Sequence, residues 1–294
     1  MAVVGRPNVG KSTLVNRMVG HKVSITSSRP QTTRSTIRGV VTHRDTASEP
    51  DWQMVLVDTP GLHRPRTELG NRLNGLVYGS LAEADAIVFV IDATGAIGPG
   101  DRLIAERVAA VTSPTVLAVN KMDAAGRGEV MAQLTESAAW DLTAYVPVSA
   151  REGEGVDELF DELEPLLPEG PLYFPADQWS DQPESQVISE IIREKFLERL
   201  RDELPHSLVV RVEDLDERQD GLVTIAADVI VERPSQRGIV IGKGGSLLQL
   251  AGTEAREELE ALLGTRVHLQ LQVSVEKDWQ RRPALLDRLG FQET

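Results

Sequence analysis

Near its start the chain reads Gly5-Arg6-Pro7-Asn8-Val9-Gly10-Lys11-Ser12-Thr13, which matches the pattern G-x-x-x-x-G-K-S of a phosphate-binding loop. Residues 1–4 are apolar and predict a short strand before this loop. Residues 11–19 place apolar side chains at helical spacing, and Gly20 follows as a stop signal. A strand, a glycine-rich loop and a helix in this order form the setting in which the motif holds a phosphate.

The chemistry of this loop indicates which parts of a nucleotide it contacts. Glycines let backbone N–H groups converge on a β-phosphate, and the helix N-terminus adds the positive end of its dipole. We expect Lys11 to neutralise the β- and γ-phosphate oxygens and the Ser12 hydroxyl to bind Mg²⁺. The alternative, an ordinary glycine turn, does not account for the lysine, the serine and both flanking elements together.

Length and composition limit the class of protein. The chain has 294 residues, enough for about two domains, and no cysteine, which excludes disulfides and thiolate zinc sites and suits a reducing cytosol. No apolar run approaches the ~18 residues of a membrane span, and we expect no signal peptide before the first strand. The net charge of −14 argues against an extended nucleic-acid coat, so any RNA contact is expected to be a local patch.

The segment after the first helix has the character of a nucleotide switch. Residues 21–35, which we call the switch loop, are polar and too long for a tight connection. Thr33 is the preferred candidate to close over Mg²⁺ and the γ-phosphate, and Thr32 is the second candidate. The alternative is a solvated, threonine-rich loop.

A second candidate loop follows a predicted strand at 36–42, a charged loop at 44–51 and another strand at 52–57. An aspartate at the carboxyl end of a buried strand can hold Mg²⁺ through water, and a glycine N–H nearby can meet a γ-phosphate. We assign these roles to Asp58 and Gly61, so that the loop distinguishes triphosphate from diphosphate. The whole loop is Asp58-Thr59-Pro60-Gly61.

Two later loops can read a base. Residues 86–92 form a continuous apolar strand, which is typical of a sheet covered on both faces. The next strand ends on Asn120-Lys121-Met122-Asp123, where Asp123 can accept the N1–H and the exocyclic N2–H₂ of guanine, which adenine cannot supply. Lys121 can lie over the purine ring, and Asn120 can brace the loop. After the following strand, in Ser149-Ala150-Arg151, the Ala150 N–H is expected to reach guanine O6.

These motifs, in this order, resemble those of the GTPase superfamily, and three of them resemble its bacterial Era branch. The three are the loop at 5–13, Asp58-Thr59-Pro60-Gly61-Leu62-His63 and Asn120-Lys121-Met122-Asp123. The resemblance implies hydrolysis of GTP to GDP and phosphate with Mg²⁺, and it spans essentially the whole chain.

The resemblance also bears on how water is activated. In Ras-like relatives a glutamine closely follows the Asp-x-x-Gly loop and orients the attacking water. In this chain Leu62 follows Gly61, and leucine cannot orient water. The resemblance implies instead that Asn8 helps to bind K⁺ where an arginine finger otherwise lies, so that intrinsic turnover is slow. Arg29 and Arg34 of the switch loop could act in cis as an arginine finger, or they could be solvated or structural.

The sequence predicts two domains joined by a proline-rich spacer. We place the first domain at 1–166, a semi-rigid proline-rich linker at 167–184 and the second domain at 185–294. The second domain is expected to contain helices at 185–203 and 246–263, strands at 208–212, 222–231 and 266–275, and a tail helix near 283–289. Its order α-β-β-α-α-β resembles a type II KH domain. The predicted fold is therefore an α/β P-loop GTPase domain, with a mixed, mostly parallel sheet and helices on both faces, followed by an α+β type II KH domain.

The candidate RNA contact is the glycine-rich turn Gly242-Lys243-Gly244-Gly245. Two glycines let the backbone approach sugar and phosphate, and flanking helix N-termini point at phosphates, which is how a KH loop clamps about four nucleotides. From 233 to 253 the chain carries Arg233, Arg237 and Lys243 and no acidic residue. The following helix opens on Ser246-Leu247-Leu248-Gln249, whereas relatives often add further basic side chains there.

The resemblance implies a GTP-hydrolysing switch that binds the single-stranded 3′ end of small-subunit ribosomal RNA and acts in small ribosomal subunit maturation. It further implies a cytoplasmic monomer, with peripheral contact to the inner face of the cell membrane left open. The alternative is a GTP-gated membrane or protein-interaction module without RNA binding, which the acidic excess would favour.

The predicted residues form four sets. The nucleotide-binding set is Gly5, Arg6, Pro7, Asn8, Val9, Gly10, Lys11, Ser12, Thr13, Asp58, Thr59, Pro60, Gly61, Leu62, Asn120, Lys121, Met122, Asp123, Ser149 and Ala150. The catalytic set is Lys11, Asn8, Thr33 and Gly61. The metal set is Ser12, Thr33 and Asp58 for Mg²⁺ and Asn8 for K⁺. The RNA-binding set is Arg233, Arg237, Gly242, Lys243, Gly244 and Gly245.

Overall fold

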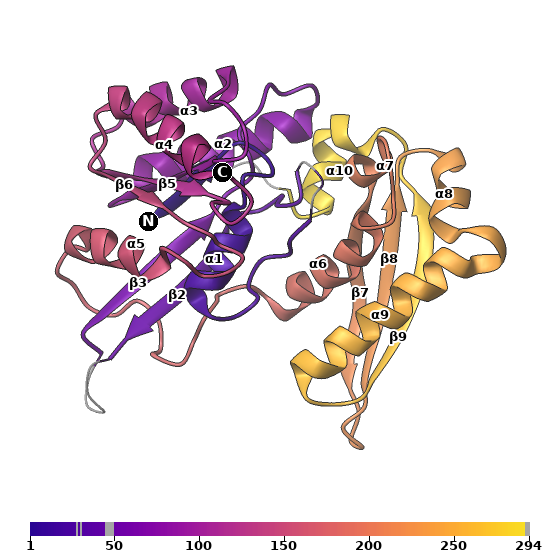
Figure 1. Ribbon diagram of the computed structural model, residues 1–294. Helices are drawn as coiled ribbons and strands as arrows, with labels where there is room; N and C mark the ends of the chain where they lie inside the picture. The colour runs from indigo at the N-terminus through magenta and orange to yellow at the C-terminus, as the bar shows by residue number, and fades with distance from the viewer. Residues whose placement is uncertain (28, 30, 45–49, 292–294) are drawn as a thin grey trace.

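The chain forms two sheets, each with its own core, in the computed structural model (Figure 1), which describes residues 1–27, 29, 31–44 and 50–291. Residues 28 and 30 of the switch loop and 45–49 of the predicted charged loop lie outside the described part of the chain. Within the described residues no helix is both long enough and apolar enough to cross a membrane.

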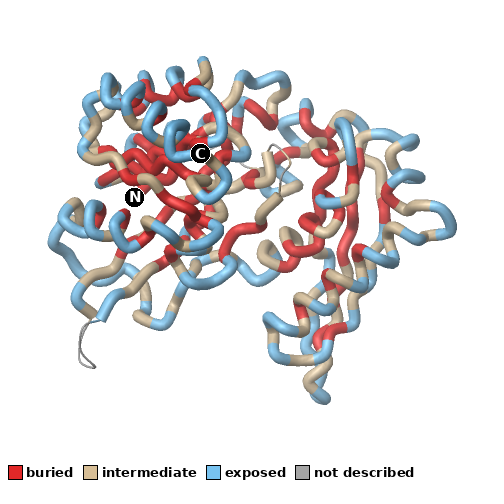
Figure 2. The backbone as a smooth tube through the Cα atoms, in the orientation of Figure 1, coloured by how far each residue is buried: buried red, intermediate tan, exposed pale blue. Residues whose placement is uncertain are grey.

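The first sheet has six strands in the order β2-β3-β1-β4-β5-β6, and every neighbouring pair is parallel except β2 with β3. The apolar strands β4 and β5 lie inside this sheet and are buried along almost their whole length (Figure 2). The predicted mixed, mostly parallel sheet is confirmed. Its strands are β1 (Ala2–Gly5), β2 (Ile37–His43), β3 (Trp52–Asp58), β4 (Ile87–Asp92), β5 (Thr115–Asn120) and β6 (Ala144–Pro147).

Helices cover both faces of the first sheet, as predicted. One face packs against α1 and α5 through residues such as Leu14 and Leu159, and the other against α2, α3 and α4 through residues such as Val77 and Ile104. The helices are α1 (Lys11–Val19), α2 (Glu68–Glu83), α3 (Pro99–Ala109), α4 (Arg127–Ser137) and α5 (Val156–Leu163). A short 3₁₀ turn follows α5, because Pro165 has no N–H to continue the α-helix.

The second sheet has three strands in the order β7-β8-β9, with β7 antiparallel and β9 parallel to β8. Helices α6 and α9 pack on one face of it, through residues such as Phe196 and Leu259. The order α-β-β-α-α-β of the predicted second domain is confirmed, with one additional short helix, α7, between α6 and β7. The elements are α6 (Glu184–Leu197), α7 (Leu204–Ser207), β7 (Val209–Glu217), β8 (Val223–Val231), α8 (Pro234–Ile241), α9 (Ser246–Leu263), β9 (Val267–Val275) and α10 (Pro283–Arg288).

Two predicted elements of the second domain differ from the structure by more than one residue. The helix predicted at 185–203 ends at Leu197, and the chain then turns through Asp202, whose φ is 56°, before α7 begins. The strand predicted at 208–212 continues to Glu217, beyond a register shift between Val212 and Asp214. The shift interrupts the side-chain alternation on an edge strand, so the sequence pattern ended early.

The linker is attached to the first domain rather than extended through solvent. The side chain of Gln53 on β3 accepts the N–H groups of Tyr173 and Phe174, both at 3.0 Å. On β2, the Val40 N–H donates to Trp179 O at 2.9 Å. Residues of the predicted spacer therefore lie along the edge of the first sheet.

A small apolar core joins the two domains near the C-terminal helix. Leu69 and Leu73 of α2 pack with Val209, Trp279 and Leu286 of the second domain, and all five are buried. Figure 1 shows α10 beside α2, with α6 facing the first domain lower in the view. The second domain thus contacts the first through both its C-terminal helix and α6.

Candidate nucleotide- and RNA-binding sites

A cavity of about 350 Å³ lies where the phosphate-binding loop, the switch loop and the Gly61 loop converge. The carboxyl ends of parallel strands meet at this edge, so residues far apart in sequence come together. The cavity is lined by Pro7, Asn8, Gly10, Lys11, Ser12, Thr13, Ile25, Thr26, Ser27, Gln31, Thr32, Thr33, Gly61 and Lys121.

The phosphate-binding loop places Lys11 at the start of α1. Gly10 has φ 97°, and a Cβ there would lie 2.3 Å from the Asn120 side chain, so the position requires glycine. The Lys11 ammonium donates to Gly5 O at 3.1 Å and Arg6 O at 3.0 Å. Burial lowers the pKa of Lys11 to about 8, although the nearby charge of Asp58 acts in the opposite direction.

Three oxygen-bearing side chains meet beside Lys11. Ser12 Oγ donates to Asp58 Oδ2 at 2.6 Å and lies 2.9 Å from Thr33 Oγ1. Asp58 Oδ1 is buried and has no hydrogen-bond partner among the described residues. Burial raises the pKa of Asp58 above its ordinary value, against the Ser12 hydrogen bond and the Lys11 charge. A hard, oxygen-binding dication such as Mg²⁺ fits this donor set, because it would satisfy the unpaired carboxylate oxygen.

The two candidate threonines of the switch loop are separated by the structure. Thr33 belongs to the oxygen cluster, and its Oγ1 also lies 3.5 Å from Asp58 Oδ2. Thr32 Oγ1 instead donates to Arg29 O at 2.7 Å. The geometry therefore favours Thr33 over Thr32 as the metal-binding threonine.

Several predicted nucleotide contacts point into the protein. Thr59 Oγ1 donates to Val3 O at 2.7 Å, and the Leu62 side chain is buried in the core beneath α2 and α3. Val9 is buried in the core on the opposite face. Arg6 pairs with Asp101 of α3 at 2.7 Å. The buried side chains of Thr59, Leu62 and Val9 shape the loops and leave only their backbones to a ligand, whereas the Arg6 side chain is partly exposed and held by Asp101.

Asn120 ties the base-reading loops to the phosphate-binding loop. Its side chain donates to Val9 O at 2.8 Å and accepts the Ala150 N–H at 3.0 Å. The bracing role predicted for Asn120 agrees with these contacts. The Ala150 N–H, predicted to meet guanine O6, donates to the Asn120 side chain in this structure. To contact a base, this N–H would have to share its hydrogen bond with Asn120 or turn away from it.

Asp123 and Lys121 are both held by neighbours. Ser149 Oγ donates to Asp123 Oδ1 at 2.7 Å, which orients the carboxylate. The Lys121 ammonium donates to Asn8 O at 2.8 Å and pairs with Asp92 at 2.6 Å. Sequence reasoning missed Asp92; the available signal was an aspartate at the end of β4, directly opposite Asn120 in the sheet.

The two switch-loop arginines contact the second domain. The Arg34 guanidinium is buried and donates to Leu208 O at 2.7 Å and to Pro205 O and His206 O, both at 2.9 Å. Arg29 Nε donates to Leu197 O at 3.4 Å. Both side chains bind carbonyl groups of the other domain. These contacts favour the structural alternative over an arginine finger acting in cis.

His63 links the two loops that line the cavity, a role that sequence reasoning missed. Its Nδ1 lies 3.0 Å from Gly61 O, and its Nε2 lies 2.6 Å from the Gln31 side chain. The residue lies two positions after Gly61, and a polar side chain at that point was the only available signal.

The candidate RNA loop connects α8 to α9. Gly244 has φ 62°, and a Cβ there would meet nothing within 4 Å, so its open side is free for an approaching chain. Lys243 is exposed, whereas Arg237 Nε donates to Val273 O at 3.0 Å on β9. A hollow of about 350 Å³ continues from Gly245 between α9 and β9. Sequence reasoning missed its other lining residues, which are Leu248, Gln249, Gly252, Thr253, Arg256, Leu269 and Leu271.

Comparison with known families and proteins agrees with both halves of this description. Residues 1–121 match the family described as 50S ribosome-binding GTPase, and residues 203–280 match the KH domain. The chain is 52% identical over 297 residues to GTPase Era of Mycobacterium avium (strain 104), covering 99% of this chain and 97% of that one. It is 50% identical over 299 residues to GTPase Era of Mycobacterium tuberculosis (strain ATCC 25177 / H37Ra), with coverage of 99% and 97%.

Two solved structures are similar over nearly the full chain. A point variant of Era from Aquifex aeolicus bound to GDP·AlF4⁻ has a TM-score of 0.93 and 36% identity, covering 99% of this chain and 98% of that one. Era in complex with MgGDPNP and nucleotides 1506–1542 of 16S ribosomal RNA has a TM-score of 0.93 and 37% identity, with coverage of 99% and 97%. The motifs, the two-domain fold and this full-length similarity show that the chain belongs to the Era family of GTPases.

Proposed function

We propose that this protein is a GTP-hydrolysing molecular switch that binds the 3′ end of 16S ribosomal RNA and acts in small ribosomal subunit maturation. The observation that carries the proposal is the oxygen cluster of Ser12, Thr33 and Asp58 beside a buried Lys11. Its RNA part is supported by the exposed glycine loop after α8 and by the 16S RNA complex of a relative that is 37% identical.

Different residues around the cavity would contact different parts of the nucleotide. Lys11 would neutralise the β- and γ-phosphates, and Ser12, Thr33 and, through water, Asp58 would hold Mg²⁺, which supplies charge stabilisation for phosphoryl transfer. The Gly61 N–H would donate to the γ-phosphate. Loss of that phosphate would release Thr33 and Gly61 together, which is the basis of a switch.

Turnover is proposed to be slow, because the three side chains considered for water activation or charge stabilisation, Leu62, Arg29 and Arg34, do not line the cavity. Leu62 is buried, and Arg29 and Arg34 bind carbonyl groups of the second domain. We further propose that Asn8, which lines the cavity with φ 65°, helps to bind K⁺ there.

Replacing K⁺ by Na⁺ is expected to lower the rate of phosphate release by about tenfold or more, because Na⁺ carries the same charge but is smaller, so it would not contact Asn8 and the transferred phosphate at the same distances. The Asn8→Ala variant should be slow in both salts, and GDP affinity should not depend on the ion. Equal rates of phosphate release in K⁺ and Na⁺ would remove the potassium proposal and leave the GTPase assignment intact.

Introducing two aspartates, Lys243→Asp and Gly244→Asp, is expected to weaken binding of single-stranded 16S 3′-end RNA by at least about tenfold, because they repel the phosphates that the loop would clamp. Aspartate tolerates the positive φ of position 244, so the fold should persist. Fluorescence anisotropy with a labelled RNA measures the change.

The control for this experiment is the double variant Arg266→Asp with His268→Asp. Both residues are exposed and lie beyond the far end of α9, whose 18 residues span about 27 Å. This variant has the same change in formal charge and should bind RNA nearly as the wild type does. If the loop variant also binds as the wild type does, the RNA assignment fails and a GTP-gated membrane or protein-interaction module becomes the better description.

A further inference from the structure

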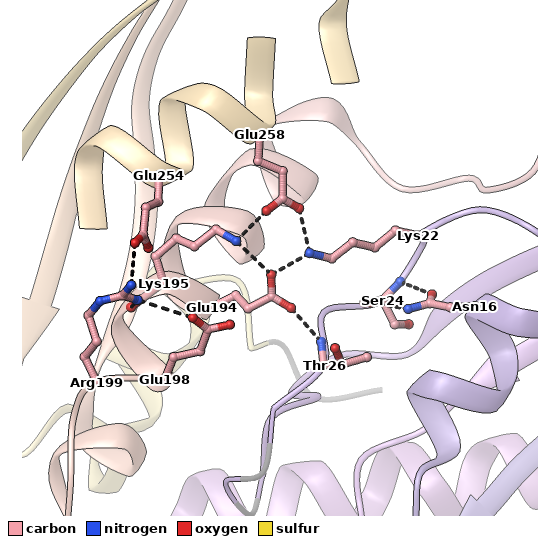
Figure 3. A network of polar contacts seen from close by, with 10 residues as sticks. All are labelled: Asn16, Lys22, Ser24, Thr26, Glu194, Lys195, Glu198, Arg199, Glu254 and Glu258. Atoms are coloured by element: carbon pink, nitrogen blue, oxygen red, sulfur yellow. Dashed lines mark hydrogen bonds and ion pairs between the residues drawn. The ribbon is translucent and has the colours of Figure 1, made fainter. Parts of the chain in front are cut away.

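The first end of the switch loop is anchored within its own domain. Asn16 of α1 donates to Ser24 O at 2.7 Å and accepts the Ser24 N–H at 2.9 Å (Figure 3). It also accepts the Val23 N–H at 2.9 Å. Beyond this point Thr26, Thr32 and Arg34 contact the second domain before β2 begins at Ile37. The position of Thr33 therefore depends on what holds the loop between Ser24 and β2.

Glu194 of α6 holds one side of the loop. Its Oε1 accepts the Thr26 N–H at 2.8 Å, and its Oε2 accepts from Lys22 at 2.5 Å. Lys22 also contacts Glu258 of α9 at 2.6 Å, and Lys195 bridges Glu194 and Glu258 from the second domain (Figure 3). Glu194 is only 3% exposed, and a buried carboxylate requires paired partners. Lys22 and Thr26 of the switch loop supply part of this pairing, and the other members of the network belong to the second domain.

The neighbouring residue, Arg193, holds the other side of the loop. Its guanidinium donates to Thr32 O and forms a two-point contact with Glu190 at 2.9 and 2.6 Å. The side chain is 1% exposed, so this geometry is fixed by packing as well as by charge. Thr32 directly precedes Thr33, and displacement of its carbonyl would displace the Thr33 hydroxyl from Ser12.

We propose that Arg193 and Glu194 are positioning residues for GTP hydrolysis, which hold the switch loop from the second domain so that Thr33 stays at the magnesium site. These adjacent residues on α6 hold two points of the switch loop, the Thr26 N–H and the Thr32 carbonyl. The inference rests on the proposed GTP hydrolysis and assigns to it two residues outside the nucleotide-binding domain.

Removing either grip, by Arg193→Ala or Glu194→Ala, is expected to lower kcat by about tenfold and raise the Mg²⁺ concentration for half-maximal GTP hydrolysis by about tenfold, as for a typical coupling between sites. GDP affinity should change less than twofold, because GDP has no γ-phosphate for Thr33 to approach. The milder variants Arg193→Lys and Glu194→Gln, which keep a donor to Thr32 O and an acceptor for the Thr26 N–H, should recover most of both losses.

Two controls separate positioning from general damage. Arg199→Ala lies on the same chain segment and contacts Glu254 and Glu198 within the second domain. Asp287→Ala breaks the ion pair with Arg72, which joins the domains elsewhere. Both variants should keep wild-type kcat and Mg²⁺ dependence.

The outcomes are distinguishable from failure of the GTPase assignment itself. If the wild type hydrolyses GTP and Arg193→Ala and Glu194→Ala match it in kcat and Mg²⁺ dependence, the positioning role is wrong. The role is also wrong if Asp287→Ala or Arg199→Ala loses as much activity as they do. If the wild type hydrolyses no GTP, the proposed function fails first.

Discussion

Replacement of Asp123 by asparagine is expected to reduce GTP affinity by at least about 100-fold and to create a preference for xanthosine triphosphate, because a polar site rejects a base that leaves its groups unpaired. The carboxylate can accept two N–H groups from guanine, and Ser149 fixes its orientation at 2.7 Å. Asparagine has one acceptor and one donor, which match the N–H and carbonyl edge of xanthine.

Competition between the two triphosphates for a fluorescent analogue measures this change. The control is Asp157→Asn, an equivalent substitution at an exposed position on α5 that should leave selectivity unchanged. Unaltered GTP selectivity in the Asp123→Asn variant would show that the base is read elsewhere.

Replacement of Lys11 by methionine should lower GTP affinity by about 100-fold or more, since each hydrogen bond to a charged group contributes ~1.5–3 kcal/mol and the ammonium would reach both the β- and γ-phosphates. Burial lowers the pKa of this ammonium to about 8. Phosphate favours the charged form, so the pKa rises on binding. Wild-type affinity should therefore be highest below about pH 8 and fall as the pH rises through that value.

Titration of GTP binding between neutral and alkaline pH tests this expectation against the methionine variant. Any titration of the nucleotide itself affects both proteins equally, so the difference between the two profiles reports Lys11. Parallel profiles would show that Lys11 does not control the pH dependence.

Local chemistry explains why much of the fold was predictable. The helix predicted at 11–19 has those bounds in the structure, because glycines before and after it set its ends. The strands β4 and β5 are continuously apolar apart from their polar end residues, which identifies a sheet buried on both faces. Each of these signals lies within a few neighbouring residues.

The helix α2 was missed for an equally local reason. Its buried leucines and valine recur every four residues, but Gly70, Gly75 and Gly79 lower its helix propensity. Its burial against the first sheet and the second domain stabilises it instead. That packing is not visible in the segment itself.

The contacts between the domains could not be read from the sequence at all. Arg34 binds three backbone carbonyls, Arg193 binds another, and Glu194 accepts a backbone N–H. Backbone groups are present at every residue, so they leave no signature that marks one as a partner. The nucleotide contacts differ, because phosphate and guanine chemistry demands particular side chains at particular spacings.

The attachment of residues 173–180 to β2 and β3 affects how the first domain behaves when isolated. A fragment that stops at Leu166 would uncover the edge of β2 where Val40 donates to Trp179 and Gly39 bridges to Ser180. Bare strand edges pair with other chains, so that fragment would self-associate, whereas one that ends just after Ser180 carries its own cover. The proline-rich linker thus also protects the first domain from aggregation through the edge of β2.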